Sequence, residues 1–592
     1  MRSFRKLCKS VISSTLVMTV LCANSSVPAI VHGISTEPSD IDLLLDDESS
    51  IDTGAVINGI IDFIPDDSEN NDNNVLEDTL LDDSVIWTSL TSSETGKSIS
   101  LRSASMAEEN GYKYYISGGN AVIDSYVGEE TEVDIPETLG GLSVTEIGYA
   151  AFSGNVKITS VKIPESVKRI NHDAFNGCSS LAFIDIPESV ISIQDGAFSG
   201  CSSLKSITIP DSISRIEDNT FSGCSKLSDI KLNNIDYIGK NSFSQCISLI
   251  DFNIPETVTA IGNMAFAGSG LKSIEVPDTI SSLGYGIFAN CGELSKAKLP
   301  KEITVLNSKN GVGMFTNCTA LEQVSFPEKL VEIGDYTFSG CVLLKSISIP
   351  ETVNKLGAFA FSECISLEDV NIPEAVTRVE NGTFSCCYAL PSIKLHDSIV
   401  YLGEAAFEDC INLSSITIPE NTVEIGEECF YNCDNIKEIS VPESVKQLGG
   451  GAFGSCDTLE RVSLPDSIKE LCCSHNSGLF TDDIALKEVK LPSSLQTIGV
   501  VSFMNCVSIE KIDLPETVTA IGDAAFENCL SLKEIHIPDG ISVICSRTFK
   551  DCNSLKSAIL PKNIDEVRNN AFENCISLSD LGQRAGFFKF AE

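Results

Sequence analysis

Histidine, tryptophan and basic residues are scarce in this sequence. Its 592 residues include five histidines, one tryptophan and 41 lysines and arginines against 83 aspartates and glutamates, which gives a net charge of -42. Phosphate groups are bound by clustered lysine and arginine, so this balance argues against nucleic acid and anionic membranes as partners. The H-E-x-x-H, G-x-S-x-G and phosphate-loop patterns are also missing. The sequence therefore predicts a protein that is not an enzyme and carries no metal or cofactor.

Long apolar runs are missing as well, apart from one near the N-terminus. A basic start is followed by an apolar run at residues 11–23, and the small residues 27–29 suit cleavage after Ala29. The run is too short to cross a bilayer comfortably, and no second stretch reaches about 18 residues. We therefore predict a signal peptide at residues 1–29, export from the cell, and no membrane span.

Residues 30–110 contain little that can form a core. They are rich in Asp, Asn and Ser without a hydrophobic period, which predicts an acidic, disordered linker. Asn71 lies in a stretch that imitates a calcium-binding loop, but it stands where the loop needs glycine, and no flanking helices are evident. The residues at the ligand offsets are Asp66, Ser68, Asn70, Asp72, Asn74 and Glu77. Whether the linker binds calcium or a partner is left open.

The dominant pattern is the phrase A-F-x-x-C, which recurs 19 times with a nearly fixed spacing. Fourteen of the 18 spacings are 23 residues, two are 22 and two are 27. A period of about 20 to 29 residues is typical of a solenoid, in which each coil covers the apolar face of the next. The sequence predicts such a stack of about 19 coils over residues 151–575.

Each repeat combines a short strand with a turn. In the unit that starts at Cys178, Leu181, Ile184 and Ile186 are spaced as in a strand, and Pro187 ends it because proline lacks the N–H that a ladder needs. A second extended segment and a turn follow, and the Ala-Phe pair is buried. Stacking should place each phenylalanine above the last at about 4.8 Å per coil. Strands should line one face of the stack and tighter turns the other.

The open ends of such a stack need covers. Residues 111–150 are predicted as an N-terminal cap with a hairpin formed by residues 112–116 and 121–126. Residues 576–592 contain Phe587 and Phe588 and are predicted as the C-terminal cap.

The full unit, L-x-x-I-x-I-P-x-x-V-x-x-I-G-x-x-A-F-x-x-C, resembles the BspA-like class of leucine-rich repeats. The resemblance implies a leucine-rich repeat solenoid, mainly β, wound as a right-handed superhelix of about 19 coils with a parallel strand-lined face. It also implies a secreted or cell-surface protein that adheres to an extracellular protein ligand, on host matrix or neighbouring cells, through that face. A structural spacer in an extracellular layer, with the acidic linker as its active end, is the alternative.

Cysteine follows the repeat, because 16 of the 23 cysteines lie three residues after a repeat phenylalanine. Asn155, Ser269 or Asp483 stands where cysteine is missing. All these side chains are small and able to hydrogen-bond a tight turn, which predicts a buried ladder of neutral thiols. Disulfides are the alternative in an exported protein, although stacked side chains do not readily reach the disulfide torsion. The predicted structural ladder includes Phe175, Cys178, Phe198, Cys201, Phe361, Cys364, Phe526 and Cys529.

Candidate ligand contacts fall on the strand face and on two insertions. The outward strand positions are small and polar with almost no aromatics, which favours weak or multivalent binding. The insertions, at residues 306–315 and 471–480, are either binding loops or tolerated additions, and Cys472, Cys473 and His475 in the second lack a clear fourth ligand for zinc. The candidate face residues are Lys162, Phe183, Asp185, Arg461, Glu488, Lys490, Lys511, Asp513 and His536, and the candidate loop residues are Lys309, Asn310, His475 and Asn476.

Overall fold

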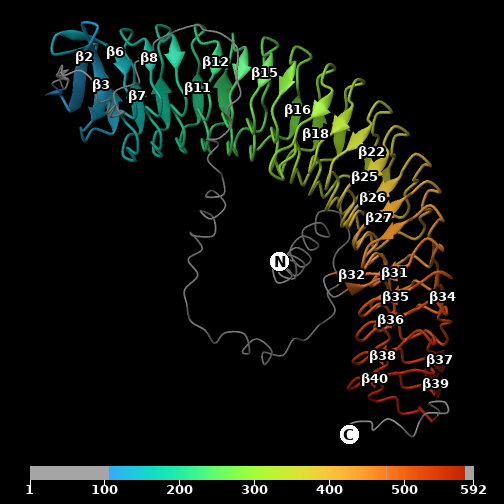
Figure 1. The fold of residues 1–592 in the computed structure, drawn as a ribbon. Helices are drawn as coiled ribbons and strands as arrows, with labels where there is room; N and C mark the ends of the chain where they lie inside the picture. Colours follow the sequence, from blue (N-terminus) through green and yellow to red (C-terminus); the bar gives the residue numbers. More distant parts are fainter. Residues whose placement is uncertain (1–105, 475–476, 580–592) are drawn as a thin grey trace, which may run out of the picture. The chain divides into compact units, whose positions relative to one another are not determined.

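The computed structural model describes residues 106–474 and 477–579 (Figure 1). The predicted signal peptide, nearly all of the acidic linker with its calcium-like loop, and most of the predicted C-terminal cap lie outside these residues. The chain divides into two units, Met1–Ile99 and Ser100–Glu592, and the described coils all belong to the second. Across the described residues of that unit, no helix is long and apolar enough to cross a membrane.

The described chain opens with a small group of strands. They are β1 (Ala107–Glu109), β2 (Tyr112–Ser117), β3 (Asn120–Tyr126), β4 (Glu132–Asp134), β5 (Thr138–Leu139) and β6 (Leu142–Ile147). β2 and β3 form an antiparallel hairpin, and both turn residues, Gly118 and Gly119, have positive φ. β1 pairs with β2, so the ordered strands begin before the expected boundary at residue 111. The sequence of β1, Ala-Glu-Glu, gives no hydrophobic signal that could have predicted this strand. β3 pairs in parallel with β6 and joins the hairpin to the first coils.

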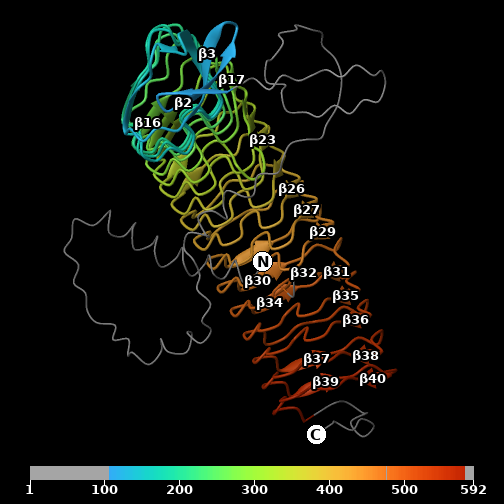
Figure 2. The same cartoon turned by 90° about the vertical axis from the view of Figure 1, so that its left-hand side faces the viewer.

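The coils then form two ladders of parallel strands, which run along different sides of the stack (Figure 2), although some coils lack the first strand. The first ladder begins with β4 and continues with β7 (Ser160–Lys162), β9 (Phe183–Asp185), β11 (Ser206–Thr208), β13 (Asp229–Lys231), β16 (Ser273–Glu275), β18 (Lys296–Lys298), β20 (Gln323–Ser325), β22 (Ser346–Ile347), β24 (Asp369–Val370), β28 (Glu438–Ser440), β30 (Arg461–Ser463), β34 (Glu488–Lys490), β37 (Glu534–His536) and β39 (Ser557–Ile559).

The second ladder begins at the end of β6 and consists of two-residue strands. These are β8 (Arg169–Ile170), β10 (Ser192–Ile193), β12 (Arg215–Ile216), β14 (Tyr237–Ile238), β15 (Ala260–Ile261), β17 (Ser282–Leu283), β19 (Val305–Leu306), β21 (Glu332–Ile333), β23 (Lys355–Leu356), β25 (Arg378–Val379), β26 (Tyr401–Leu402), β27 (Glu424–Ile425), β29 (Gln447–Leu448), β31 (Glu470–Leu471), β35 (Thr497–Ile498), β36 (Ala520–Ile521), β38 (Val543–Ile544) and β40 (Glu566–Val567). The expectation of a single strand-lined face was incomplete, because this second extended segment also pairs in parallel from coil to coil.

The third side of each coil holds the A-F-x-x-C segment. The Phe175 N–H donates to the Ala197 carbonyl of the next coil at 2.8 Å, and this bond recurs along the stack. Asp173 and Gly177, two residues before and after Phe175, have positive φ of 56° and 73°. Positive φ recurs at these two positions in most coils, on Asp, Asn and Gly, which tolerate it, and also on other residues such as Ala405 and Val501. The chain therefore turns tightly at both ends of the segment.

The repeat phenylalanines form one continuous stack through the core. All are buried, and consecutive rings lie 4.9 Å to 6.1 Å apart between centroids. Phe175 and Phe198, for example, are 5.6 Å apart with an angle of 7° between their planes. This register confirms the predicted solenoid of stacked coils.

The cysteines form a second stack beside the rings. The Cys201 thiol donates to the Phe175 carbonyl of the preceding coil at 3.2 Å, and all 16 repeat cysteines make the equivalent bond. All 21 described cysteines are free thiols. Burial raises the pKa of Cys178 and of Cys246 to about 12, which keeps these thiols neutral near neutral pH.

Candidate interaction surface

The outward side chains of the first ladder form a mainly polar surface, which we call the first-ladder face. Strand side chains alternate between core and solvent, so each three-residue strand places its outer two residues on this face. In β9, Ile184 is buried while Phe183 and Asp185 are exposed. The face therefore presents the two outer positions of each three-residue strand, and most of these positions are exposed.

The candidate face residues all lie on the first-ladder face, but they fall into two groups. The first group lies on β7 and β9, where Lys162 pairs with Asp185 in the strand register. Phe183, at the start of β9, is 56% exposed. The second group lies near the other end of the array, on β30, β34, β37 and the coil between β34 and β37, and consists of Arg461, Glu488, Lys490, Lys511, Asp513 and His536. The two groups belong to coils far apart in the stack, so they do not form one compact site.

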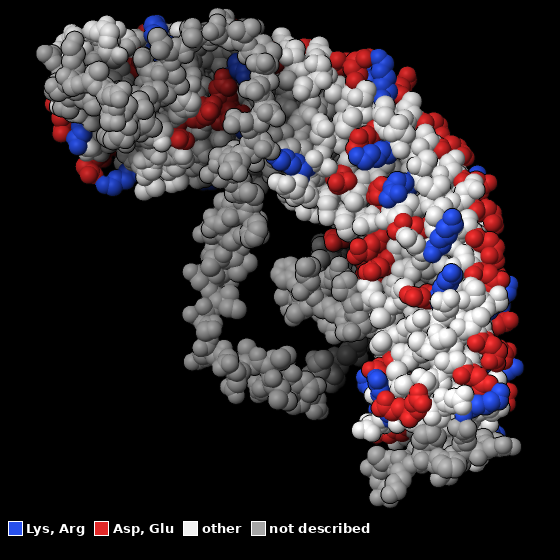
Figure 3. All heavy atoms as spheres, viewed as in Figure 1, with Lys and Arg blue, Asp and Glu red and all other residues white. Residues whose placement is uncertain are grey.

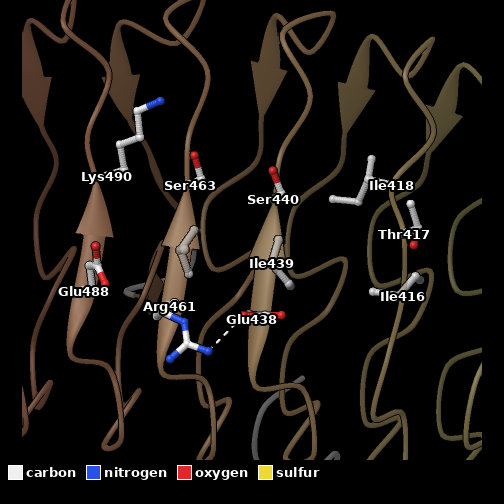
Figure 4. Close-up of a pocket in the computed structure, with 11 residues that line it drawn as sticks. Ile416, Thr417, Ile418, Glu438, Ile439, Ser440, Arg461, Ser463, Glu488 and Lys490 are labelled. Carbon is white, nitrogen blue, oxygen red and sulfur yellow. Dashed lines mark hydrogen bonds and ion pairs between the residues drawn. The ribbon is translucent and has the colours of Figure 1, made fainter.

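Within the second group the structure brings Arg461, Glu488 and Lys490 together around a shallow groove of about 460 Å³. Figure 4 shows Glu488, Arg461 and Glu438 in one row across the coils and Lys490, Ser463 and Ser440 in another. Isoleucine and valine side chains line the groove between the rows. Its lining residues are Ile416, Thr417, Ile418, Glu438, Ile439, Ser440, Arg461, Val462, Ser463, Glu488 and Lys490.

Charged side chains on this part of the face pair with one another. Arg461 Nη2 lies 3.0 Å from Glu438 Oε2, and this hydrogen bond raises the pKa of the Arg461 guanidinium above its ordinary value. Lys511 Nζ lies 2.9 Å from Asp513 Oδ1, and that hydrogen bond raises the pKa of the Lys511 ammonium. The surface can therefore offer fixed charges, hydroxyl groups and an apolar strip to a ligand.

A second shallow hollow, of about 350 Å³, lies on the same face beside β13. Phe252 takes a strand position there and packs against Phe243 and Phe266, with ring centroids 5.3 Å and 5.1 Å away. No strand is formed at residues 251–254, so the first ladder is interrupted at this hollow. The groove near Arg461 also borders an interruption, at residues 416–418, and the sequence gives no signal for either hollow.

The two insertions form small hairpins. Lys309 and Val312 pair across a turn whose central residues, Asn310 and Gly311, have positive φ of 52° and 77°. In the second insertion, β32 (Cys473–Ser474) pairs antiparallel with β33 (Ser477–Gly478). The candidate residues Lys309 and Asn310 thus sit at an exposed turn, whereas His475 and Asn476 lie outside the described residues. The Asn-Gly dipeptide is a strong hairpin signal that could have predicted the first of these turns.

Each hairpin has its own threonine, and the two threonines bind their hairpins to the stack through equivalent hydrogen bonds. Thr481 Oγ1 accepts the Gly478 N–H at 2.8 Å and donates to the Val501 carbonyl of the next coil at 2.7 Å. Thr316 Oγ1 accepts the Gly313 N–H at 2.8 Å and donates to the carbonyl of Tyr336 at 2.7 Å. Gly313 and Gly478 do not adopt the positive φ of other coils at this position. The hydroxyl therefore replaces a hydrogen bond of the regular turn.

The cysteines of the second insertion lie at the surface. Cys472 and Cys473 are exposed, unlike the repeat cysteines. Over residues 106–474 and 477–579, no three side chains of His, Cys, Asp or Glu are grouped so that they could hold a metal ion. These two thiols are therefore accessible to solvent.

Comparisons with known proteins agree with the geometry. The profile of the BspA type leucine-rich repeat region matches residues 145–269, 236–365, 354–475 and 474–587. Comparison with curated protein sequences finds no match.

Solved structures with similar coils include a leucine-rich cell surface protein from Faecalibacterium prausnitzii, 25% identical, with a TM-score of 0.41, covering 65% of this chain and 94% of that one. A leucine-rich repeat protein from Bacteroides ovatus is 25% identical with a TM-score of 0.30, and the match covers 80% of this chain and 93% of the other. Because the family profile spans nearly the whole array of coils, the chain belongs to the family of BspA-type leucine-rich repeat proteins.

Proposed function

We propose that this chain is an exported, surface-located protein that binds an extracellular protein ligand through the first-ladder face and performs no catalysis. The observation that carries the proposal is the groove around Arg461, Glu488 and Lys490, where charge, hydroxyl groups and an apolar strip converge on an exposed strand surface. The apolar run at residues 11–23 supports export, and the family supports a surface location. Host matrix and neighbouring cells are the proposed sources of the ligand.

Small polar side chains make up most of this face, so each contact contributes little. Tight interfaces depend on buried aromatic and arginine anchors, and Phe183 is an isolated exposed aromatic on this face. Affinity should therefore come from many coils or many copies acting together. The proposed role is adhesion rather than capture of one ligand at high affinity.

The test is a binding screen of the full-length protein against immobilised extracellular-matrix proteins. Lys490→Glu reverses a charge at the groove and should weaken binding to the ligand that the screen identifies. The matched control is Lys446→Glu, which makes the same change at an exposed lysine next to β29 on the second ladder. If Lys490→Glu and Lys446→Glu bind the ligand equally well, the groove is not the binding site. A screen without any bound ligand would favour a structural spacer instead.

A further inference from the structure

Ten charged residues at the edge of the first-ladder face alternate in sign across five successive coils, one just before the strand position and one at its start. In each coil two neighbouring residues carry opposite charges, and both signs reverse in the next coil. The first column consists of Lys437, Glu460, Lys487, Glu510 and Lys533, and the second of Glu438, Arg461, Glu488, Lys511 and Glu534. We call these ten residues the charge checkerboard. Nine of them are exposed, and Glu460 is partly buried.

The backbone register places these residues side by side. Glu438, Arg461 and Glu488 are direct partners in β28, β30 and β34, and Lys511 is the partner of Glu534. Ion pairs link several of them within and between coils. Arg461 contacts Glu438 at 3.0 Å and Glu460 at 3.7 Å, Lys487 contacts Glu460 at 3.3 Å, and Lys533 contacts Glu510 at 2.6 Å.

Stacking of the coils does not require this pattern. The same two positions hold Lys345-Ser346, Glu368-Asp369, Pro391-Ser392 and Ser414-Ser415 in the four preceding coils, which stack on the same backbone. Exposed ion pairs also contribute little to folding stability. The strict alternation therefore calls for an explanation outside the stability of a single chain.

The checkerboard is also a neutral patch on a strongly acidic protein. Its five cations and five carboxylates cancel, whereas the whole chain carries a net charge of -42. Figure 3 shows acidic and basic side chains intermingled along the edge of the array that carries β34, β37 and β39. Two copies of this chain repel each other over most of their surfaces, but not here.

The pattern is complementary to itself. If two copies face each other about a two-fold axis parallel to the stack, the first column of one copy lies over the second column of the other. Every cation then faces a carboxylate in all five coils, as a two-fold interface requires of one shared patch. We propose that the charge checkerboard is a contact surface for a second copy of this chain, which rests on the proposed function of this face in protein binding.

Such a contact is weak for one pair of molecules. Five coils at about 4.8 Å give a strip about 24 Å long and two residues wide. The area of this strip is much smaller than the roughly 800 Å² that each partner buries in a standard interface. Many copies on one surface would add their contacts, so the patch suits homotypic adhesion between densely covered surfaces. At about 0.1 M salt, screening beyond about 10 Å suppresses the repulsion between distant charges while close contacts persist.

The test uses beads coated densely with the full-length chain, with clumping measured by light scattering. One double variant, Arg461→Glu with Lys511→Glu, makes the second column wholly acidic. The other, Glu460→Lys with Glu510→Lys, makes the first column wholly basic. Wild-type beads should clump, beads with either variant alone should stay dispersed, and a mixture of the two should clump again, because its facing columns are complementary.

The matched control, Lys446→Glu with Lys469→Glu, makes the same charge change beside β29 and β31 on the second ladder and should clump like the wild type. Circular dichroism before coating verifies that each variant is folded. Three results would each overturn the inference. The wild-type beads could stay dispersed, beads with one double variant alone could clump as strongly as the wild type, or the mixture of the two double variants could stay dispersed. Matrix binding in the Lys490→Glu screen is measured separately, so homotypic contact can fail while the proposed function stands.

Discussion

Asp483 Oδ1 accepts a hydrogen bond from the backbone N–H of Cys456 at 2.8 Å, deep inside the thiol stack. The carboxyl is fully buried, and its Oδ2 atom contacts no hydrogen-bond partner in the described structure. In 16 other coils the side chain at this position is a thiol that donates to the phenylalanine carbonyl of the preceding coil. The corresponding carbonyl here is that of Phe453. A protonated Oδ2 would supply the same donor.

The first prediction is that stability falls as pH rises because of Asp483. Burial raises the pKa of this carboxyl well above its ordinary value, and Cys456, Cys506, Asp457 and Asp482 around it offer no cation. The stabilisation is complete below the unfolded-state pKa of about 3.9 and is lost as pH rises toward the folded-state pKa. Within that window the free energy of unfolding should fall by about 1.4 kcal/mol per pH unit.

Asp483→Asn should abolish this part of the pH dependence in urea unfolding, and Asp483→Cys should restore the regular ladder. A pH profile of the Asn variant parallel to that of the wild type would show that Asp483 is ionised in the folded protein.

The second prediction concerns the ring stack. Phe361 is fully buried between Phe338 and Phe384, with centroids 5.3 Å and 5.6 Å away. Phe361→Ala leaves a cavity between the two neighbouring rings and should lower the free energy of unfolding by about 3 to 5 kcal/mol. Because each coil contacts mainly its neighbours, hydrogen exchange should rise first in the coils around residues 338–384. Phe361→Leu is the control and should show a smaller rise. Uniform exchange along the whole array would contradict local coupling.

The third prediction separates the two classes of cysteine. Iodoacetamide should label Cys472 and Cys473 in the native protein and leave Cys178 unlabelled, because thiolate is the reacting species. At one fixed pH the exposed pair should be labelled long before Cys178, which is buried and whose pKa burial raises to about 12. Mass spectrometry after digestion reads each site, and denatured protein is the control. Equal labelling of Cys178 and Cys473 would refute the buried ladder.

The fourth prediction tests the threonine that anchors the second hairpin. Thr481→Val keeps the shape of the side chain but leaves the Gly478 N–H and the Val501 carbonyl without the hydroxyl. The loss should be about 1 to 3 kcal/mol, since buried polar groups lose their partner. Thr481→Ser keeps the hydroxyl and should lie close to the wild type. Urea unfolding measures both, and equal losses in the two variants would point to packing rather than hydrogen bonding.

Features that repeat in the sequence could be predicted, whereas single exceptions could not. The spacing of Phe175, Phe198 and their equivalents predicts the register of the stack, because each coil must align with the next. The second ladder was missed because its two-residue strands are too short to show an alternating pattern. The groove near Arg461 was missed because its shape depends on how one coil departs from regular pairing. Asp483 was recognised as a ladder substitution, but its burial and missing partner come only from the packing.

The hydrogen bonds between successive coils connect neighbours one above another, as from Phe175 to Ala197. A molecule held at one end and gripped at the other would therefore carry tension along these bonds, and we expect it to peel from an end rather than shear apart. Each released coil of about 23 residues would lengthen the chain by on the order of 75 Å. A solenoid built this way should yield coil by coil under force while its remaining coils stay folded.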